Sequence, residues 1–166
     1  KQKGCSQSFS SYRQISLLNV LYKIFASILH RRISSVIDPQ LQCTQFGFRK
    51  SRSTSDPIHL LRRVHEMFEA TNAPLHLLFL DWSMAFDNLS HIGLISALTR
   101  FGLPSPHINL IANLYYHATF EVKDNYHHSN IHTQGSGIRQ GCPPSGTLFA
   151  MALDPLPEVA SPFFCC

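Results

Sequence analysis

The sequence predicts an α+β fold in which helices pack on a small antiparallel sheet. Three observations support this fold class. Apolar residues recur at helical spacing over long segments, a short apolar run ends at a carboxylate as a buried strand would, and a later segment alternates in polarity. Segments with the helical pattern outnumber those with the strand pattern, which fits α+β.

Two helices and an extended connection are expected in the first half of the chain. The helical pattern starts at Ser16 and is stopped by Pro39. Residues 40–54 are polar and contain glycine, which predicts an extended, partly stranded segment. The second helix is expected to begin at Asp56, an N-cap followed by proline at the first helical position, and to end before Asn72.

The second half of the chain is expected to hold the sheet and three more helices. Residues 75–81 read as a strand. A helix with a serine N-cap and a terminal glycine is expected over 90–102, and the next opens at Ser105. Residues 118–134 alternate around an Asp-Asn pair and predict a hairpin, and 145–153 should form a short helix.

Composition limits the classes of function. The 166 residues make one domain of globular composition, 44% hydrophobic and 14% charged. A net charge of +4 permits a nucleic-acid partner without demonstrating one. The five cysteines form no CxxC pair, so neither a zinc site nor a disulfide framework is indicated, and a reducing, intracellular compartment is expected, cytoplasmic and/or nuclear. No apolar run approaches membrane-spanning length, so no membrane partner is expected, and no protein partner is evident.

The apolar run before Asp81 carries the first candidate for chemistry. Residues 77–87 read LLFLDWSMAFD, so the run delivers a carboxylate at the end of the expected strand. Nucleotidyl transfer with two divalent cations needs such carboxylates, because magnesium prefers oxygen ligands. From the strand pattern alone, an aspartate that caps the next helix or pairs with an arginine is the favoured interpretation.

Three further motifs accompany this one. Residues 137–149 read GIRQGCPPSGTLF, a glycine-flanked polar turn that introduces a helix. Residues 44–56 read TQFGFRKSRSTSD and residues 12–23 read YRQISLLNVLYK. Taken together in chain order (12–23, 44–56, 77–87, 137–149), the four motifs resemble those of reverse transcriptases, closest to those of non-LTR (LINE-like) retrotransposons.

The resemblance implies a fold and an activity. The fold would be the fingers and part of the palm of a right-hand polymerase, and the activity RNA-directed DNA polymerisation with two Mg²⁺ ions in the intact enzyme. The partners would be an RNA template, a DNA primer and dNTP. Asp81 would be the catalytic metal ligand, assisted by the carbonyl of Trp82, and Phe86 would exclude a 2′-hydroxyl. Asp87 is expected to be structural, orienting the loop.

The resemblance also assigns binding residues. Gln140 and Gly141 would position the nucleotide, and Arg49 would grip the triphosphate bidentately. Lys50 and Arg52 would lie on template phosphates, although a solvated basic turn is the ordinary fate of such cations. Two more arginines could face nucleic acid: Arg13, which is otherwise a surface residue, and Arg139, for which template phosphate and a solvated loop charge are equally weighted.

The sequence departs from the family pattern in two ways that matter. Gly146 stands where proline is usual and should cost about 1 kcal/mol inside a first helical turn, which suggests relaxed selection or a divergent lineage. The Tyr-x-Asp-Asp motif that supplies the other carboxylates is missing, so the chain is expected to be truncated before it and inactive alone. We expect residues 1–11 to be a disordered lead-in, 12–157 the fingers–palm fragment and 158–166 an unstructured tail. The alternative is a non-catalytic nucleic-acid-binding remnant.

Overall fold

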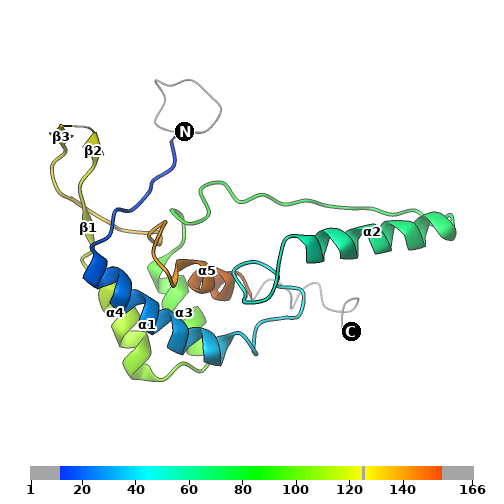
Figure 1. Ribbon diagram of the computed structural model, residues 1–166, viewed down its shortest axis with the longest axis horizontal. Coiled ribbons are helices and arrows are strands. Elements are labelled where there is room, and N and C mark those ends of the chain that lie inside the picture. Colours follow the sequence, from blue (N-terminus) through cyan, green and yellow to red (C-terminus); the bar gives the residue numbers. More distant parts are fainter. Residues whose placement is uncertain (1–11, 125, 155–166) are drawn as a thin grey trace.

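The computed structural model describes residues 12–124 and 126–154 (Figure 1). The expected lead-in over 1–11 and tail over 158–166 therefore lie outside the described residues. Within the described part there are five helices and four short strands, and all four strands lie between the fourth and the fifth helix. The order along the chain is α1 (Val20–Ile37), α2 (Ser55–Ala70), α3 (His91–Arg100), α4 (Ser105–Tyr115), β1 (Thr119–Phe120), β2 (Lys123–Asp124), β3 (His127–His128), β4 (His132–Thr133) and α5 (Ser145–Leu153).

The core lies between helices. Figure 1 shows α1, α3, α4 and α5 gathered together, whereas α2 projects away from them. Helix α3 packs on both α4 and α5, and its Leu94 and Leu98 are almost completely buried. The other helices add Leu29, Ile33 and Ile37 from α1, Ile111 and Tyr115 from α4, and Leu148 and Met151 from α5. Because apolar side chains leave water together here, this cluster is the main source of stability in the described structure.

Helix α1 confirms the helical pattern but begins later than predicted, at Val20. The side chain of Asn19 accepts a hydrogen bond of 2.8 Å from the backbone N–H of Leu21, which is the action of an N-cap. The preceding residues are not helical, and the N–H of Ser16 donates to the carbonyl of Gln140 at 3.0 Å. Ser16, where the predicted helix was to start, instead contacts a segment far away in the sequence.

Helix α2 begins at Ser55, and Asp56 is a residue of its first turn rather than its N-cap. The Asp56 carboxylate accepts a 2.7 Å hydrogen bond from the N–H of Ser53. No residue of α2 is buried. This helix therefore gains little from packing in the described structure and depends on its own hydrogen bonds.

Two predicted strand segments are wrong. Residues 40–54 form successive turns, and residues 75–81 belong to an extended stretch that pairs with no other described strand. Leu78, Phe79 and Leu80 are 83%, 77% and 76% exposed. The apolar pattern is that of a strand buried on both faces, but a strand also needs a hydrogen-bonding neighbour, and the described residues do not supply one.

The predicted hairpin over 118–134 is confirmed. Strand β1 pairs with β4 in antiparallel register, with Thr119 opposite Thr133, and β2 pairs with β3, with Asp124 opposite His127. All eight strand residues are exposed. The mixture of helices and antiparallel strands agrees with the α+β prediction, but the helices pack on one another and not on the strands.

The remaining helices begin and end close to prediction. The Ser90 hydroxyl accepts from the N–H of Gly93 at 3.4 Å and caps α3, and Gly102 follows its C-terminal end with φ +67°. Pro106 lies in the first turn of α4, and Asp154 follows α5. Among the described residues, no helix combines the length and the apolar character needed to cross a membrane.

Candidate functional site

Two segments that are about fifty residues apart are bonded to one another in the described structure. The N–H of Gly137 donates to the carbonyl of Leu89 at 2.8 Å, and the N–H of Ile138 donates to the carbonyl of Phe86 at 2.8 Å. We call residues 86–91 and 136–142 the paired loops. They bring the end of the Asp81 motif into contact with the glutamine turn.

Gly137 makes this close pairing possible. Its φ is +83°, and a Cβ added to it would lie 2.7 Å from the carbonyl oxygen of Asp87. The same carbonyl accepts from the hydroxyl of Ser136 at 3.2 Å, and Nε2 of His91 lies 2.8 Å from the carbonyl oxygen of Gly137. Only a residue without a side chain allows both the backbone conformation and the approach.

Gln140 is held by Asp87. Its Nε2 lies 3.2 Å from Oδ1 and 3.4 Å from Oδ2 of that carboxylate. A carboxylate can only accept hydrogen bonds, so it fixes the amide with Nε2 towards Asp87. The Oε1 atom, on the other branch of the amide, is thereby directed away from this carboxylate as an acceptor. The structural role expected for Asp87 is thus consistent with the hydrogen bonds that it makes.

Arg139 lies between two tyrosine rings. Its guanidinium carbon is 5.3 Å from the ring centroid of Tyr22 and 5.6 Å from that of Tyr115, and one N–H donates to the Tyr22 hydroxyl at 2.7 Å. This arrangement combines cation–π attraction with a hydrogen bond. A solvated loop charge, one of the two interpretations of Arg139, is therefore wrong.

The groups around Arg139 stay neutral. Burial raises the pKa of Tyr22 to about 12, with the neighbouring Cys142 as a further cause. Burial also raises the pKa of Tyr115 and that of the Cys142 thiol, whose Sγ lies 3.7 Å from the Tyr22 hydroxyl. A raised pKa favours the protonated thiol, and the contacts of Arg139 and Cys142 with Tyr22 tie the glutamine turn to α1.

Phe86 is held among aromatic rings. Its ring stacks on that of Phe149, with centroids 4.9 Å apart and planes inclined by 16°. The ring of Phe48 meets it edge-on, with centroids 5.8 Å apart and planes inclined by 76°. Both geometries are favourable for aromatic pairs. Phe86 remains partly exposed, so part of its ring can contact a ligand.

Asp81 and Trp82 lie in the exposed extended segment before the paired loops, and Trp82 is 55% exposed. Residues 12–124 and 126–154 contain no group of three or more histidine, cysteine, aspartate or glutamate side chains arranged to hold a metal ion. The carboxylate of Asp81 and the carbonyl of Trp82 are oxygen donors of the kind that Mg²⁺ prefers. Among the described residues, however, these donors are not joined by the further side chains that a metal site needs.

Arg49 is almost completely enclosed, with its side chain 9% exposed. Its guanidinium donates to the Asp38 carboxylate at 2.9 Å and to the carbonyls of Asp38, Gln42 and Gln45 at 2.8, 2.8 and 3.2 Å. These bonds hold the turns that follow α1. In this arrangement most of the Arg49 donors already have acceptors, and a triphosphate would have to displace them.

The other expected nucleic-acid-binding cations remain accessible. Arg13, Lys50 and Arg52 are exposed, and the Arg52 guanidinium lies 5.7 Å from the ring centroid of Phe46. Two of these residues, Lys50 and Arg52, belong to the same turns that Arg49 holds together. In this segment the Arg49 side chain is enclosed and holds the turns, whereas Lys50 and Arg52 face solvent.

Tyr22, Tyr115 and Asp38 are site residues that sequence reasoning missed. The two tyrosines occupy ordinary positions in helical patterns, and Asp38 follows the last turn of α1. Their roles arise from contacts with residues far away in the sequence, such as the 117 residues that separate Tyr22 from Arg139. One local feature of the sequence could have indicated the role of Asp38: an acidic residue at a helix end lies near the basic turn that contains Arg49.

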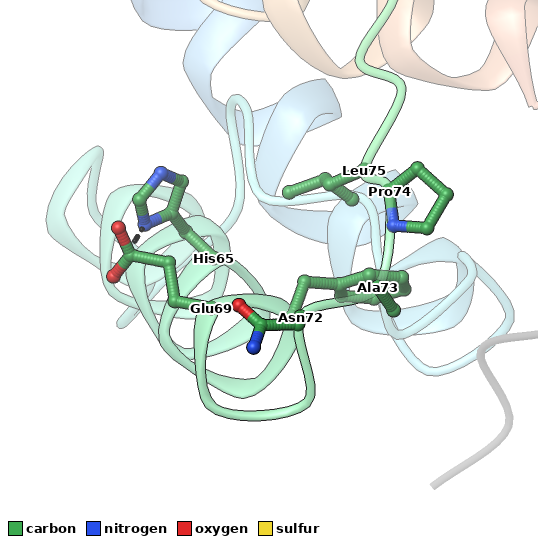
Figure 2. A pocket seen from close by; sticks show the side chains of 7 residues that line it. His65, Glu69, Asn72, Ala73, Pro74 and Leu75 are labelled. Atoms are coloured by element: carbon green, nitrogen blue, oxygen red, sulfur yellow. Dashed lines mark ion pairs between the residues drawn. The ribbon is translucent and has the colours of Figure 1, made fainter.

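Two hollows in the described part of the surface lie mainly away from the paired loops. One of about 360 Å³ lies at the C-terminal end of α2 (Figure 2). It is lined by His65, Phe68, Glu69, Asn72, Ala73, Pro74 and Leu75. Its one ion pair, between His65 and Glu69 at 3.4 Å, joins neighbours on an exposed helix. A second hollow of about 290 Å³, between α3 and α4, reaches the paired loops only at His91.

Comparison with known proteins agrees with the motifs. Residues 1–165 match the family described as "Reverse transcriptase (RNA-dependent DNA polymerase)". The chain is 30% identical over 154 residues to "Transposon TX1 uncharacterized 149 kDa protein" of Xenopus laevis, covering 93% of this chain and 12% of that protein. It is 31% identical over 153 residues to "Probable RNA-directed DNA polymerase from transposon X-element" of Drosophila melanogaster, covering 90% and 16%. A third relative from that species is "Retrovirus-related Pol polyprotein from type-2 retrotransposable element R2DM", 29% identical over 151 residues, covering 87% and 14%. The chain thus spans less than a fifth of these relatives.

Proposed function

The chain belongs to the reverse transcriptase (RNA-dependent DNA polymerase) family, and from this premise we propose that it forms the fingers and part of the palm of a non-LTR retrotransposon polymerase. The observation that carries the proposal is the bonding of the paired loops, which brings the Phe86 and Gln140 motifs together. Residues 12–157 would be the polymerase portion. Two findings support a piece of a larger enzyme: the unpaired stretch over 75–81 and the small share of each relative that the chain spans.

The reaction we propose is nucleotidyl transfer. The 3′-hydroxyl of a DNA primer attacks the α-phosphate of a dNTP, a new P–O bond forms, and pyrophosphate leaves, with RNA as the template. Mg²⁺, when bound, neutralises charge on the phosphates as it develops. Asp81 and the carbonyl of Trp82 would contribute oxygen ligands, and the remaining carboxylates would come from outside the described residues.

The paired loops would select and orient the nucleotide. The Phe86 ring would pack under the sugar, where a 2′-hydroxyl has no room. Gln140, held by Asp87 with its Oε1 directed away, would present an acceptor to the nucleotide. Arg139, fixed between Tyr22 and Tyr115, would keep the glutamine turn in place for this contact.

The fingers turns would contact nucleic acid through their exposed cations. Because the guanidinium of Arg49 is engaged by Asp38 and by backbone carbonyls, we assign this residue to holding the turns and not to the triphosphate. Lys50 and Arg52 would then meet phosphates from the surface of the same turns. Arg13 would add a further exposed cation.

Nucleotide binding tests the proposal directly. Fluorescent dTTP is titrated into the chain in the presence of an RNA–DNA hybrid. We expect Gln140→Ala and Phe86→Ala to weaken binding at least about fivefold, because each removes a contact worth about 1 kcal/mol. Lys123→Ala, on the hairpin, is the control and should bind like the wild type. Equal affinities for all four proteins would contradict the proposed site.

Primer extension tests whether the chain acts alone. With Mg²⁺ on poly(A)/oligo(dT), we expect no extension by the 166-residue chain, since its described residues contain no group of three or more side chains that could hold a metal ion. Extension that disappears in Asp81→Asn would overturn this expectation and would make the chain a polymerase in its own right.

A non-catalytic nucleic-acid-binding role is the alternative. The exposure of Arg13, Lys50 and Arg52 favours it, because accessible cations can neutralise phosphates without any metal. It predicts RNA binding that weakens with salt and is indifferent to Mg²⁺ and to Asp81→Asn. A chain that fails to bind RNA at low salt would exclude it.

A further inference from the structure

Phe48 has an unusual backbone conformation. Its φ is +60°, in the left-handed region that non-glycine residues rarely adopt, although Gly47 stands next to it. The side chain is 59% exposed, so burial of the ring does not explain the conformation. A strained residue persists where its surroundings hold it, and such residues gather at functional sites.

The ring of Phe48 occupies a notch at Gly146 in the first turn of α5. A Cβ added to Gly146 would overlap the Cδ1 atom of Phe48. It would also lie 2.7 Å from the Cγ atom and 3.1 Å from the Cβ atom of Phe48. Figure 1 shows the turns between α1 and α2 lying beside α5. Alanine or proline at position 146 would therefore expel the ring. Relaxed selection is not needed to explain this glycine, because the notch requires it.

The notch places Phe48 against Phe86. The two rings meet edge-on with centroids 5.8 Å apart, and the other contact of Phe86 is the stacked ring of Phe149, 4.9 Å away. Phe86 is thus held from two directions. Phe149 belongs to α5, the same helix that carries Gly146, so one helix supplies both a packing partner for Phe86 and the space for Phe48.

We infer that Phe48, seated at Gly146, is a positioning residue that sets how strongly this protein discriminates deoxynucleotides from ribonucleotides. The inference rests on the proposed role of Phe86 under the sugar. A single ring can tilt away to admit a 2′-hydroxyl, whereas a ring braced by Phe48 on one side and Phe149 on the other cannot. The specificity element is then a set of three rings and one glycine.

The ring contacts are tested by ¹⁹F NMR of the chain labelled with 4-fluorophenylalanine. The Phe86 signal is assigned with Phe86→Leu. Phe48→Leu and Gly146→Ala should each shift that signal, since each removes the edge-on ring. Adding Gly146→Ala to Phe48→Leu should shift it little further. Independent, additive shifts, or no shift in Phe48→Leu, would overturn the inference. Because Phe48 is exposed, Phe48→Leu keeps the test valid if Gly146→Ala does not fold.

Sugar discrimination is tested by the ratio of GTP and dGTP dissociation constants for the same proteins. We expect Phe48→Leu and Gly146→Ala to lower the wild-type preference for dGTP about three- to tenfold, mainly by tighter GTP binding, as expected for one aromatic contact. Phe86→Ala should remove it. A preference for dGTP that is lost in Phe86→Ala but unchanged in Phe48→Leu would overturn the inference about Phe48 and leave the proposed function standing. A wild-type chain that binds neither nucleotide, or both equally, would overturn the proposed function as well.

Discussion

The Arg49 guanidinium joins a carboxylate and three backbone carbonyls of the turns that follow α1. Lysine has three donors in a different geometry and cannot reach all these acceptors. We predict that Arg49→Lys lowers the free energy of unfolding by about 2 kcal/mol, because enclosed acceptors lose their partners. Urea denaturation measures it. Arg52→Lys, at an exposed position of the same turns, should change it by less than about 0.5 kcal/mol. Equal effects of the two substitutions would contradict the structural assignment of Arg49.

His30 gives the structure a dependence on pH. Its Nε2 lies 2.9 Å from the Thr147 hydroxyl, and burial lowers its pKa below the ordinary value of 6.5. Above pH 6.5 the ring is neutral in both folded and unfolded chains, so its contribution to stability is complete. As the pH falls towards the lower folded-state pKa, the unfolded chain takes up a proton that the folded chain does not, and stability is lost.

We therefore predict that the wild type loses more stability than His30→Gln between about pH 7.5 and about pH 5.5. Urea denaturation of both proteins at the two pH values measures the difference. The other histidines are the same in both proteins, so their contributions largely cancel in this comparison. A wild type and a variant with parallel pH dependence would show that His30 is solvated.

At the scale of elements, the paired loops depend on Gly137. We predict that Gly102→Ala costs about 1–2 kcal/mol, the price of left-handed backbone alone, because no atom lies within 4 Å of the added Cβ. Gly137→Ala should cost at least about 1 kcal/mol more, since its Cβ also separates the loops and weakens their hydrogen bonds. Thermal or urea unfolding compares the two. A cost for Gly137→Ala no larger than that for Gly102→Ala would mean that the loops are not closely paired.

The elements that sequence reasoning predicted are those stabilised by local signals. The apolar stripe and serine cap of α3, the alternating polarity of the hairpin and the polar turn before α5 are all visible in short stretches of sequence. The strand predicted over 75–81 is wrong, because a strand needs a pairing partner, which the local apolar pattern does not reveal. The same holds for the site: Asp87 and Gln140 were found through motifs, whereas the contacts of Arg139 with Tyr22 and Tyr115 join three distant segments.

At the scale of the whole molecule, the described structure has a stable and a weakly supported part. Helix α2 has no buried residue, and the extended stretch over 73–82 makes no strand pairing, whereas α3 and α5 lie in the core. We predict that amide hydrogens of α2 and of this stretch exchange quickly and those of α3 and α5 slowly, because exchange follows local opening. Hydrogen exchange read by mass spectrometry measures it. Uniform protection would mean that α2 is held by contacts absent from this arrangement.

In the proposed site, Asp81 holds a metal ion together with the nucleotide. Trp82, the single tryptophan of the chain, adjoins it and is 55% exposed, so its fluorescence reports on the site. The most direct measurement is quenching of Trp82 by Mn²⁺ in the presence of dTTP. We predict saturable quenching in the wild type and in Asp124→Asn, and an apparent affinity at least about tenfold weaker in Asp81→Asn, as for loss of a metal ligand. Identical titrations of the wild type and Asp81→Asn would contradict a metal–nucleotide site at Asp81.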